Sequence, residues 1–277
     1  MPEPWQIRLY RRSIKKKETM RAVLRLLPLL EGKRCLEIGC ATGTSSLLLR
    51  QRGGEWVSAD FQPEQVESAR QLLGERVELI GKRQLPFGDG AFDIVVGLNF
   101  LEHLHDDVGF VREMARVLKT GGHFLLTCPD GDSSRLGFQL KRAYGFTARS
   151  GGFGHVRDGY SRSELENLVS AVGLELESLE SYSRIFTEFV ENSLNYVYHR
   201  SANHRGDGKG TRSFHGDTAP ASLSEFEAVT WKYRAYAGAY PLLRGLSLLD
   251  RVIPFSEGYM FAVRARKPLL PAALPRY

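Results

Sequence analysis

Cysteine is scarce in this sequence, and long apolar runs are absent from it. The three cysteines, Cys35, Cys40 and Cys128, form no CxxC pair, which argues against a disulfide framework or a zinc knuckle. No stretch of about 18 uncharged apolar residues occurs, so the sequence predicts no membrane-spanning helix. Residues 1–17 are charged where a secretory signal peptide needs an apolar segment. Together these absences predict a cytoplasmic protein with free thiols.

The excess of positive charge is also small. The sequence has 38 Lys and Arg residues and 32 Asp and Glu residues, which give a formal net charge of +6. Such an excess steers phosphates, nucleic acids or lipid headgroups only modestly. Much of it lies in residues 11–17, where no aromatic side chains separate the charges. A nucleic-acid surface normally interleaves charge with stacking aromatics, so we expect a solvated helix face and no stable nucleic-acid partner.

Strands and helices alternate between residues 34 and 129. A first amphipathic helix is predicted over residues 13–30 from its helical spacing of apolar residues. The predicted strands then cover residues 34–40, 56–60, 77–81, 92–99 and 123–129. The predicted helices cover residues 44–53, with Thr42 and Thr44 as capping candidates, 63–74 and 107–122. This alternation is typical of an α/β fold with a doubly wound parallel sheet.

The alternation breaks twice in the second half of the sequence. Residues 131–160 and 183–257 lack it, although the second stretch contains predicted helices over 186–200 and 224–240 and a polar loop over 201–220. Between them lie a predicted helix at 162–173 and a strand at 174–182, and a last strand follows at 258–267. We therefore predict one domain over 1–277 with two insertions, 131–160 and 183–257, that form a helical cap over the substrate.

A glycine turn at residues 37–43 carries the first functional signal. Glycines let a ligand approach the backbone, and the helix that follows offers free N–H groups. The turn does not fit GxGxxG, because Ala41 and Thr44 stand where that pattern needs its second and third glycines. Asp60 ends the next strand about 20 residues downstream, where a carboxylate can accept both ribose hydroxyls. These features fit an adenosine that bears a short zwitterion better than a nicotinamide dinucleotide.

In their order, the motifs resemble those of class I S-adenosylmethionine-dependent methyltransferases, in the group that includes ubiquinone-type and other small-molecule enzymes. The matching segments are residues 37–43, 58–70, 85–106 and 116–130, with a weaker match over 155–176. The resemblance implies a Rossmann-like sheet of seven strands, mostly parallel with the last strand antiparallel. It further implies a cofactor-binding core over residues 20–130, S-adenosylmethionine as cofactor and S-adenosylhomocysteine as product.

The resemblance also implies roles for individual residues. Glu37 is expected near the methionine end, Asp60 at the ribose and Phe61 against the adenine. Three groups are expected to complete the cofactor site. They are the backbone of Gly39, Cys40 and Gly43 in the turn, Lys82 after the third strand, and Asn99, Phe100 and Leu101 after the fourth strand.

Three positions depart from the family pattern. Ala41 replaces the middle glycine of the turn, which is tolerable where its φ is negative. Gly81 stands where an adenine-binding aspartate is common, so adenine recognition falls to the backbone around Lys82. Thr120 replaces a proline and affects only how the preceding helix ends.

Methyl transfer from a sulfonium is an in-line displacement, in which the protein mainly aligns donor and acceptor. A hydroxyl or amine acceptor must also lose a proton, and histidine is the usual base near neutral pH. The candidates are His103, after the fourth strand, and His155, which we favour because its loop also holds Arg157 and Tyr160 as substrate contacts. His103 and His105 are two residues apart and face different ways on a helix, so we expect no metal site.

The second insertion bears on the acceptor. An apolar stretch with basic interruptions predicts a small, partly apolar or lipid- or sugar-linked acceptor, or a patch resting on the inner face of a membrane. Its members are Tyr233, Tyr236, Tyr240, Leu242, Leu243, Leu246, Leu248, Leu249, Val252, Ile253 and Phe255. Two alternatives stay open: a catalytically silent relative that binds the cofactor as a regulatory or structural ligand, and an RNA methyltransferase. Cys128 stands where some RNA methyltransferases keep a nucleophile, but a second cysteine near the fourth strand is missing.

Overall fold

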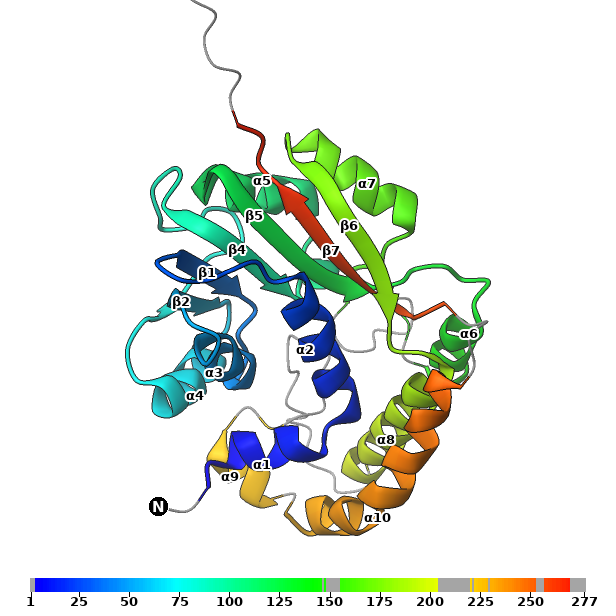
Figure 1. Ribbon diagram of the computed structural model, residues 1–277. Coiled ribbons are helices and arrows are strands. Elements are labelled where there is room, and N and C mark those ends of the chain that lie inside the picture. Colours follow the sequence, from blue (N-terminus) through cyan, green and yellow to red (C-terminus); the bar gives the residue numbers. More distant parts are fainter. Residues whose placement is uncertain are drawn as a thin grey trace, which may run out of the picture.

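The computed structural model describes residues 3–145, 147, 155–203, 220, 222–228, 230–252 and 257–269. Its centre is a seven-stranded sheet of order β3-β2-β1-β4-β5-β7-β6 (Figure 1). The strands are β1 (Arg34–Ile38), β2 (Glu55–Asp60), β3 (Val77–Leu79), β4 (Phe92–Leu98), β5 (Leu118–Pro129), β6 (Glu175–Tyr182) and β7 (Met260–Arg266). Neighbours among β1–β5 pair in parallel, whereas β7 lies antiparallel between β5 and β6. The predicted fold class is confirmed.

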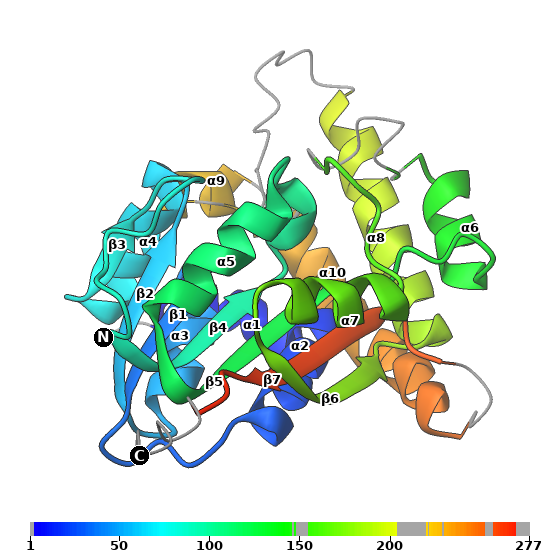
Figure 2. The same ribbon diagram turned by 90° about the horizontal axis from the view of Figure 1, so that it is seen from above.

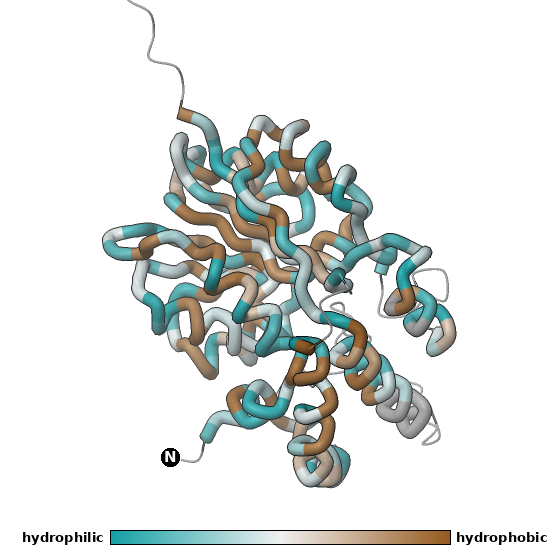
Figure 3. Tube along the Cα trace, turned by 45° about the vertical axis from the view of Figure 1, so that its right-hand side comes forward, coloured by the Kyte–Doolittle hydropathy of each residue, from teal (hydrophilic) through white to brown (hydrophobic). Residues whose placement is uncertain are grey.

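Helices cover both faces of the sheet (Figure 2). On one face, α2 (Ile14–Leu26) and α3 (Thr44–Arg50) share a buried cluster with Ile94 and Val96 of β4, and α4 (Pro63–Leu73) lies beside α3. On the other face, α5 (Asp107–Val117) and α7 (Arg162–Ala171) pack against Val95 and its neighbours. Side chains alternate between the faces of a strand, so β4 is buried on both sides. Figure 3 shows hydrophobic residues gathered along the central strands.

The structure corrects the predicted ends of two helices and the predicted cap of a third. The first helix ends at Leu26, because Leu27 is already extended and precedes a proline, which disfavours helical backbone. The helix predicted to residue 122 ends at Val117, and β5 begins at Leu118 with extended backbone. The cap of α3 is Gly43, in the left-handed conformation, and no side-chain hydrogen bond from Thr42 or Thr44 caps the helix.

A helix at the start of the chain, α1 (Trp5–Arg12), was not predicted. Trp5 stacks on Phe226, at a ring distance of 5.7 Å. The basic residues within 11–17 were expected to face solvent, but the Arg12 guanidinium donates to the hydroxyl of Tyr233. Lys17 likewise donates to the hydroxyl of Tyr240 over 3.0 Å. Part of the basic excess therefore joins α1 and α2 to a distant helix.

That distant helix belongs to a helical layer formed by the two insertions. It consists of α6 (Leu136–Ala143), α8 (Ile185–Asn203), α9 (Leu223–Ala228) and α10 (Thr230–Leu248), followed by the 3-10 turn η4 (Leu249–Arg251). We call these elements the cap. α8 packs against α6 and α10 (Figure 1). Most of the predicted loop 201–220, and parts of both insertions, lie outside the described residues.

Apolarity and length together decide whether a helix can cross a bilayer. Within the described ranges, no helix has enough of both to do so.

Candidate active site

Two glycines with positive φ stand in the turn between β1 and α3. Gly39 has a φ of +81°, and a Cβ atom there would lie 2.7 Å from the carbonyl oxygen of Leu98. Gly43 has a φ of +87°, and a Cβ atom there would lie 3.1 Å from the Cα of Ala69. The amides of Gly39 and Cys40 both donate to the carbonyl of Ala59, at 2.9 and 3.1 Å. The turn therefore needs glycine at both positions, as expected of a backbone that lies against a ligand.

Ala41 departs from the expectation of a negative φ, because its φ is +47°. Its amide donates to Oδ2 of Asp60 at 2.9 Å, and the amide of Gln62 donates to Oδ1 at 3.1 Å. Asp60 is fully buried at the end of β2. The carboxylate thus holds the glycine turn and the loop after β2 together, and its contact with the ribose stays a prediction.

Glu37, the last acidic residue of β1, is fully buried beneath the turn. The hydroxyl of Ser46 donates to its carboxylate. Burial raises the pKa of Glu37, and hydrogen bonds from Ser45, Ser46 and Ser58 oppose the rise. The side chain ties β1 to the start of α3, and its expected contact with the methionine end stays a prediction.

Asn99 follows β4 and faces the turn across the sheet edge. Its φ is +46°, a left-handed conformation that asparagine tolerates better than most residues. The hydroxyl of Thr127 donates to Oδ1 of Asn99 at 2.8 Å, and the amide of Asn99 donates to the carbonyl of Thr127 at 3.0 Å. A strained residue held by several bonds at the end of a central strand is a common feature of functional sites.

The other predicted cofactor residues divide between core and surface. Phe100 and Leu101 are fully buried. Phe61 is half-buried, and its ring lies 5.8 Å from that of Phe100 and 5.4 Å from that of Phe110. Lys82 is exposed in the loop after β3. Phe61 therefore borders the core at the cofactor edge, and its contact with adenine stays a prediction.

A pocket opens between the turn, α2 and the cap, and we call it the central pocket. Most of the side chains around it are polar or charged. Its lining includes Lys15, Lys16, Thr19, Gly39, Cys40, Ala41, Thr42, Thr44, Ser45, Asn99, Glu102, Lys141, His155, Glu191, Asn192 and Asn195, together with Tyr10, Met20, Leu98, Pro129 and Met260. The turn expected to hold the donor and the cap residues expected near the acceptor thus share one pocket.

Charged groups join α2 to the cap beside this pocket. Nζ of Lys15 lies 3.2 Å from Oε1 of Glu188 in α8, whose side chain is 2% exposed. Burial alone would raise the pKa of Glu188, but Lys15 and Lys141 together hold it below its usual value. Burial lowers the pKa of Lys141.

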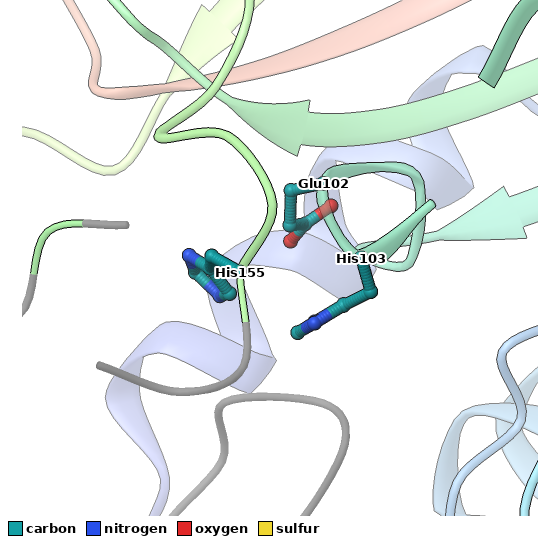
Figure 4. Close-up of side chains that lie close together, drawn as sticks. All are labelled: Glu102, His103 and His155. Atoms are coloured by element: carbon teal, nitrogen blue, oxygen red, sulfur yellow. The ribbon is translucent and has the colours of Figure 1, made fainter. Parts of the chain in front are cut away.

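Glu102, His103 and His155 come together at the edge of the pocket (Figure 4). Glu102 and His103 lie in the 3-10 turn η1 (Leu101–His103) after β4, and both are buried. The ring centroids of His103 and His155 are 4.7 Å apart, in an edge-to-face arrangement. This cluster was not predicted from the sequence, although Glu102 lies within the segment 85–106 that resembles the family.

Burial, followed by the charges of His103, Lys141 and Lys15, lowers the pKa of His155 to about 2. An efficient general base has a pKa near the working pH. His155 is therefore a neutral imidazole with little tendency to accept a proton, which does not favour the predicted role of base. The choice between His103 and His155 stays a prediction.

Arg157 and Tyr160, predicted to contact substrate, pack away from the central pocket. Tyr160 is 1% exposed, and its hydroxyl donates to Oδ2 of Asp107 at 2.8 Å. Arg157 lies 3.2 Å from the same carboxylate and 2.5 Å from Oε1 of Glu164, and its guanidinium stacks over the ring of Tyr160 at 3.8 Å. These contacts anchor the loop that carries His155, and the expected contact of Arg157 and Tyr160 with substrate stays a prediction.

The three cysteines are buried free thiols. Burial raises the pKa of Cys35 to about 12 and that of Cys128 well above its usual value. Because the thiolate is the reactive form, Cys128 is a poor nucleophile here. This weakens the alternative of an RNA methyltransferase that uses a cysteine.

The central part of the chain is similar to known methyltransferases. Residues 36–126 match a family model described as a methyltransferase domain. A Mycobacterium tuberculosis protein named "probable S-adenosylmethionine-dependent methyltransferase" is 32% identical over 108 residues, which cover 38% of this chain and 39% of that protein.

Two further relatives have named small-molecule substrates. The 27-O-demethylrifamycin SV methyltransferase of Amycolatopsis mediterranei is 33% identical over 36% of this chain and 40% of its own length. The demethylmenaquinone methyltransferase of Clavibacter sepedonicus is 34% identical over 38% of this chain and 44% of its own length. The chain thus matches less than half the length of these relatives.

Solved structures share the fold over most of the chain. An S-adenosylmethionine-dependent methyltransferase from Mesorhizobium loti has a TM-score of 0.54 at 15% identity, covering 89% of this chain and 96% of its own. The [4+2]-cyclase SpnF has a TM-score of 0.54 at 20% identity, covering 91% of this chain and 81% of its own. At these identities the likeness concerns the fold alone.

Proposed function

Because residues 36–126 form a class I S-adenosylmethionine-dependent methyltransferase domain, we propose that the chain methylates a small molecule held in the central pocket. The methyl group would pass from S-adenosylmethionine to an oxygen, nitrogen or carbon atom. One observation carries the proposal: the glycine turn and Asn99 line the same pocket as Glu102 and His155. Donor and acceptor sites that share one pocket meet the main requirement of an in-line displacement, which is alignment.

The residues at the turn fit the cofactor. Gly39, Cys40 and Ala41 present backbone to the pocket, and the Asp60 carboxylate ends β2 directly behind Ala41. When bound, S-adenosylmethionine supplies a methyl group already activated by the sulfonium. The chain's own part is to hold the cofactor at this backbone, to border the methyl group near Asn99, and to exclude water with the cap.

The acceptor we propose is polar where it meets the protein. Lys15, Lys16 and Lys141 bring positive charge to the pocket, and Asn192 and Asn195 add amide groups. The aromatic residues of α10 that suggested an apolar acceptor are used elsewhere, since Tyr233 and Tyr240 bond to α1 and α2. A hydroxylated acceptor with an anionic group matches this lining, and alignment within it would supply about 7–11 kcal/mol of the barrier reduction.

The fold also admits a second function, because a [4+2]-cyclase shares it with a TM-score of 0.54. A chain that binds the cofactor but transfers no methyl group, as in our silent alternative, would have this architecture too. The alternatives differ in turnover and not in cofactor binding, so both must be measured.

Calorimetric titration of the purified chain with S-adenosylhomocysteine, with NADH as control, is the first test. We expect micromolar binding of S-adenosylhomocysteine and none of NADH. Incubation with labelled S-adenosylmethionine and a panel of hydroxylated acceptors, with and without carboxylate or phosphate groups, should then release S-adenosylhomocysteine. Absence of cofactor binding would overturn the proposal, and binding without turnover across the panel would favour the silent relative.

A further inference from the structure

Two imidazoles and a carboxylate converge beside the central pocket. One ligand atom each from Glu102, His103 and His155 lies within 4.8 Å of the other two. Figure 4 shows the three side chains around one common space, with His155 approaching from a different segment than the other two. Glu102 is 3% exposed and His103 is 1% exposed. Polar groups buried so close together are costly unless they share a proton or a cation.

We propose that Glu102, His103 and His155 bind a divalent transition-metal ion, which nothing in the family assignment requires. Two histidines and one carboxylate on one side of an ion form a ligand set that first-row divalent metals accept, and it leaves coordination positions open. Imidazole favours Mn²⁺, Co²⁺ or Zn²⁺ over Mg²⁺ and Ca²⁺, which prefer oxygen ligands.

The backbone holds the three ligands in place. The amide of Val156 donates to the carbonyl of Glu102 at 2.9 Å, so the residue after His155 is tied directly to the residue before His103. The amide of His103 donates to the carbonyl of Phe100 at 3.0 Å and closes the η1 turn. The bonds of Arg157 and Tyr160 to Asp107 anchor the rest of the loop. A site whose ligands are fixed before the ion binds loses little entropy on binding.

An ion held by these ligands would border the central pocket, because Glu102 and His155 both line it. A hydroxyl bound there would become more acidic, as water does on a metal ion, and could lose its proton without a strong protein base. This role rests on the proposed function, whereas binding of the ion does not.

Positive charge near the site opposes a cation. Lys15 and Lys141 both act electrostatically on His155. Lys15 is paired with Glu188 at 3.2 Å, so Lys141 is the main opposing charge. A Lys141→Met variant should therefore bind the ion more tightly than the wild type.

The test is titration of the tag-free chain of residues 1–277 with Co²⁺, followed by its d–d absorption, with Zn²⁺ as competitor. We expect one Co²⁺ per chain, displaced by Zn²⁺. Glu102→Gln and His155→Gln should weaken binding by about tenfold or more, since each removes a ligand. His105→Ala is the matched control: it removes an exposed histidine of the same segment and should leave Co²⁺ binding unchanged.

Two further measurements keep the outcomes distinct. S-adenosylhomocysteine binding in the same samples reports whether each variant is folded and whether the cofactor site exists. In the wild type, Zn²⁺ should shift the imidazole NMR signals of two of the seven histidines, a readout that needs no variant.

Cofactor binding without Co²⁺ binding, or equal Co²⁺ binding in Glu102→Gln, His155→Gln and wild type, would overturn the metal site and leave the proposed function standing. Specific Co²⁺ binding without cofactor binding would support the metal site and overturn the proposed function.

Discussion

At the scale of single residues, the glycine turn stores strain in Ala41. A left-handed conformation costs an L-residue about 1–2 kcal/mol, and Ala41 has a φ of +47°. A local hydrogen bond offsets this cost, because the Ala41 amide donates to Oδ2 of Asp60 at 2.9 Å. The turn therefore keeps a left-handed backbone at position 41, although alanine stands where the family pattern has glycine.

Ala41→Gly should raise the free energy of unfolding by about 0.5–1 kcal/mol, since glycine adopts this φ without strain but gains freedom in the unfolded chain. Urea unfolding measures the change, and S-adenosylhomocysteine should bind at least as tightly as before. Arg76 is exposed, lies away from the turn and has a φ of +66°. Arg76→Gly is therefore the control, which should relieve strain without changing the affinity for the cofactor. A loss of stability in Ala41→Gly would show that the methyl group of Ala41 packs favourably.

Glu37 gives a prediction with a defined pH dependence. Burial raises its pKa above the usual 4.5, so the folded state binds this proton more tightly than the unfolded state. Its contribution to stability is therefore fully present below pH 4.5 and is lost as the pH rises through the folded pKa. Glutamine carries no titrating proton, so the stability of Glu37→Gln does not fall in this way as the pH rises.

Glu37→Gln should thus be more stable than wild type at neutral pH by about 1 kcal/mol, with a difference that vanishes in acid. Its affinity for S-adenosylhomocysteine should fall if the carboxylate serves the methionine end. Thermal unfolding across pH, together with calorimetry, checks both statements. Glu78→Gln, on the exposed side of β3, is the control and should change neither. A stability difference that is constant with pH would contradict the assignment of the titrating group.

At the scale of elements, the loop that carries His155 depends on one anchor. Asp107, at the start of α5, accepts from Tyr160 at 2.8 Å and from Arg157 at 3.2 Å. The amide of Tyr160 also donates to the carbonyl of Pro129 at the end of β5, over 2.9 Å. The loop is thereby fixed to the edge of the sheet where the pocket lies.

Tyr160→Phe should cost about 1–2 kcal/mol, because the partly buried Asp107 carboxylate loses a donor while the ring stays in place. Hydrogen exchange should accelerate in peptides that contain residues 155–160, and the helix α4 serves as an internal reference that should exchange at its former rate. Equal acceleration in both regions would indicate global destabilisation and would contradict a local anchor.

Sequence reasoning predicted the elements that depend on local pattern and missed the contacts that depend on tertiary packing. The strands β1 to β5 follow from short apolar runs between glycines, and the cofactor motif lies where expected. By contrast, α1 is held by Trp5 against Phe226, a partner far away in the chain. His155 contacts His103 because an insertion folds back on the sheet edge. The sequence around either histidine therefore does not predict that the two side chains lie together.

At the scale of the whole molecule, the cap is joined to the core through the N-terminal helices. Tyr233 of α10 donates to the carbonyl of Arg8 at 3.0 Å, and Lys17 donates to Tyr240 at 3.0 Å. Lys15 in α2 also pairs with Glu188 in α8, whose side chain is 2% exposed. These links set how firmly the cap closes the central pocket.

Breaking the buried pair from one side should loosen the cap. Lys15→Met leaves Glu188 buried with less compensation and should cost about 3 kcal/mol, whereas Lys15→Met combined with Glu188→Leu should recover most of it. Arg25→Met is the control in the same helix, because its partner Glu180 lies 3.4 Å away with both side chains exposed, and such pairs contribute about 0.5 kcal/mol. Urea unfolding of the four chains at neutral pH measures the comparison.

The pH dependence of that cost identifies its source. Glu188 has a pKa held below 4.5 by Lys15 and Lys141 against the effect of burial, so its stabilisation is present above pH 4.5 and is lost as the pH falls through the lower folded value. The gap between wild type and Lys15→Met should therefore narrow in acid, where Glu188 is protonated in both. A gap that persists in acid, or a double variant no more stable than Lys15→Met, would mean that Lys15 stabilises the cap through its packing and not through its charge.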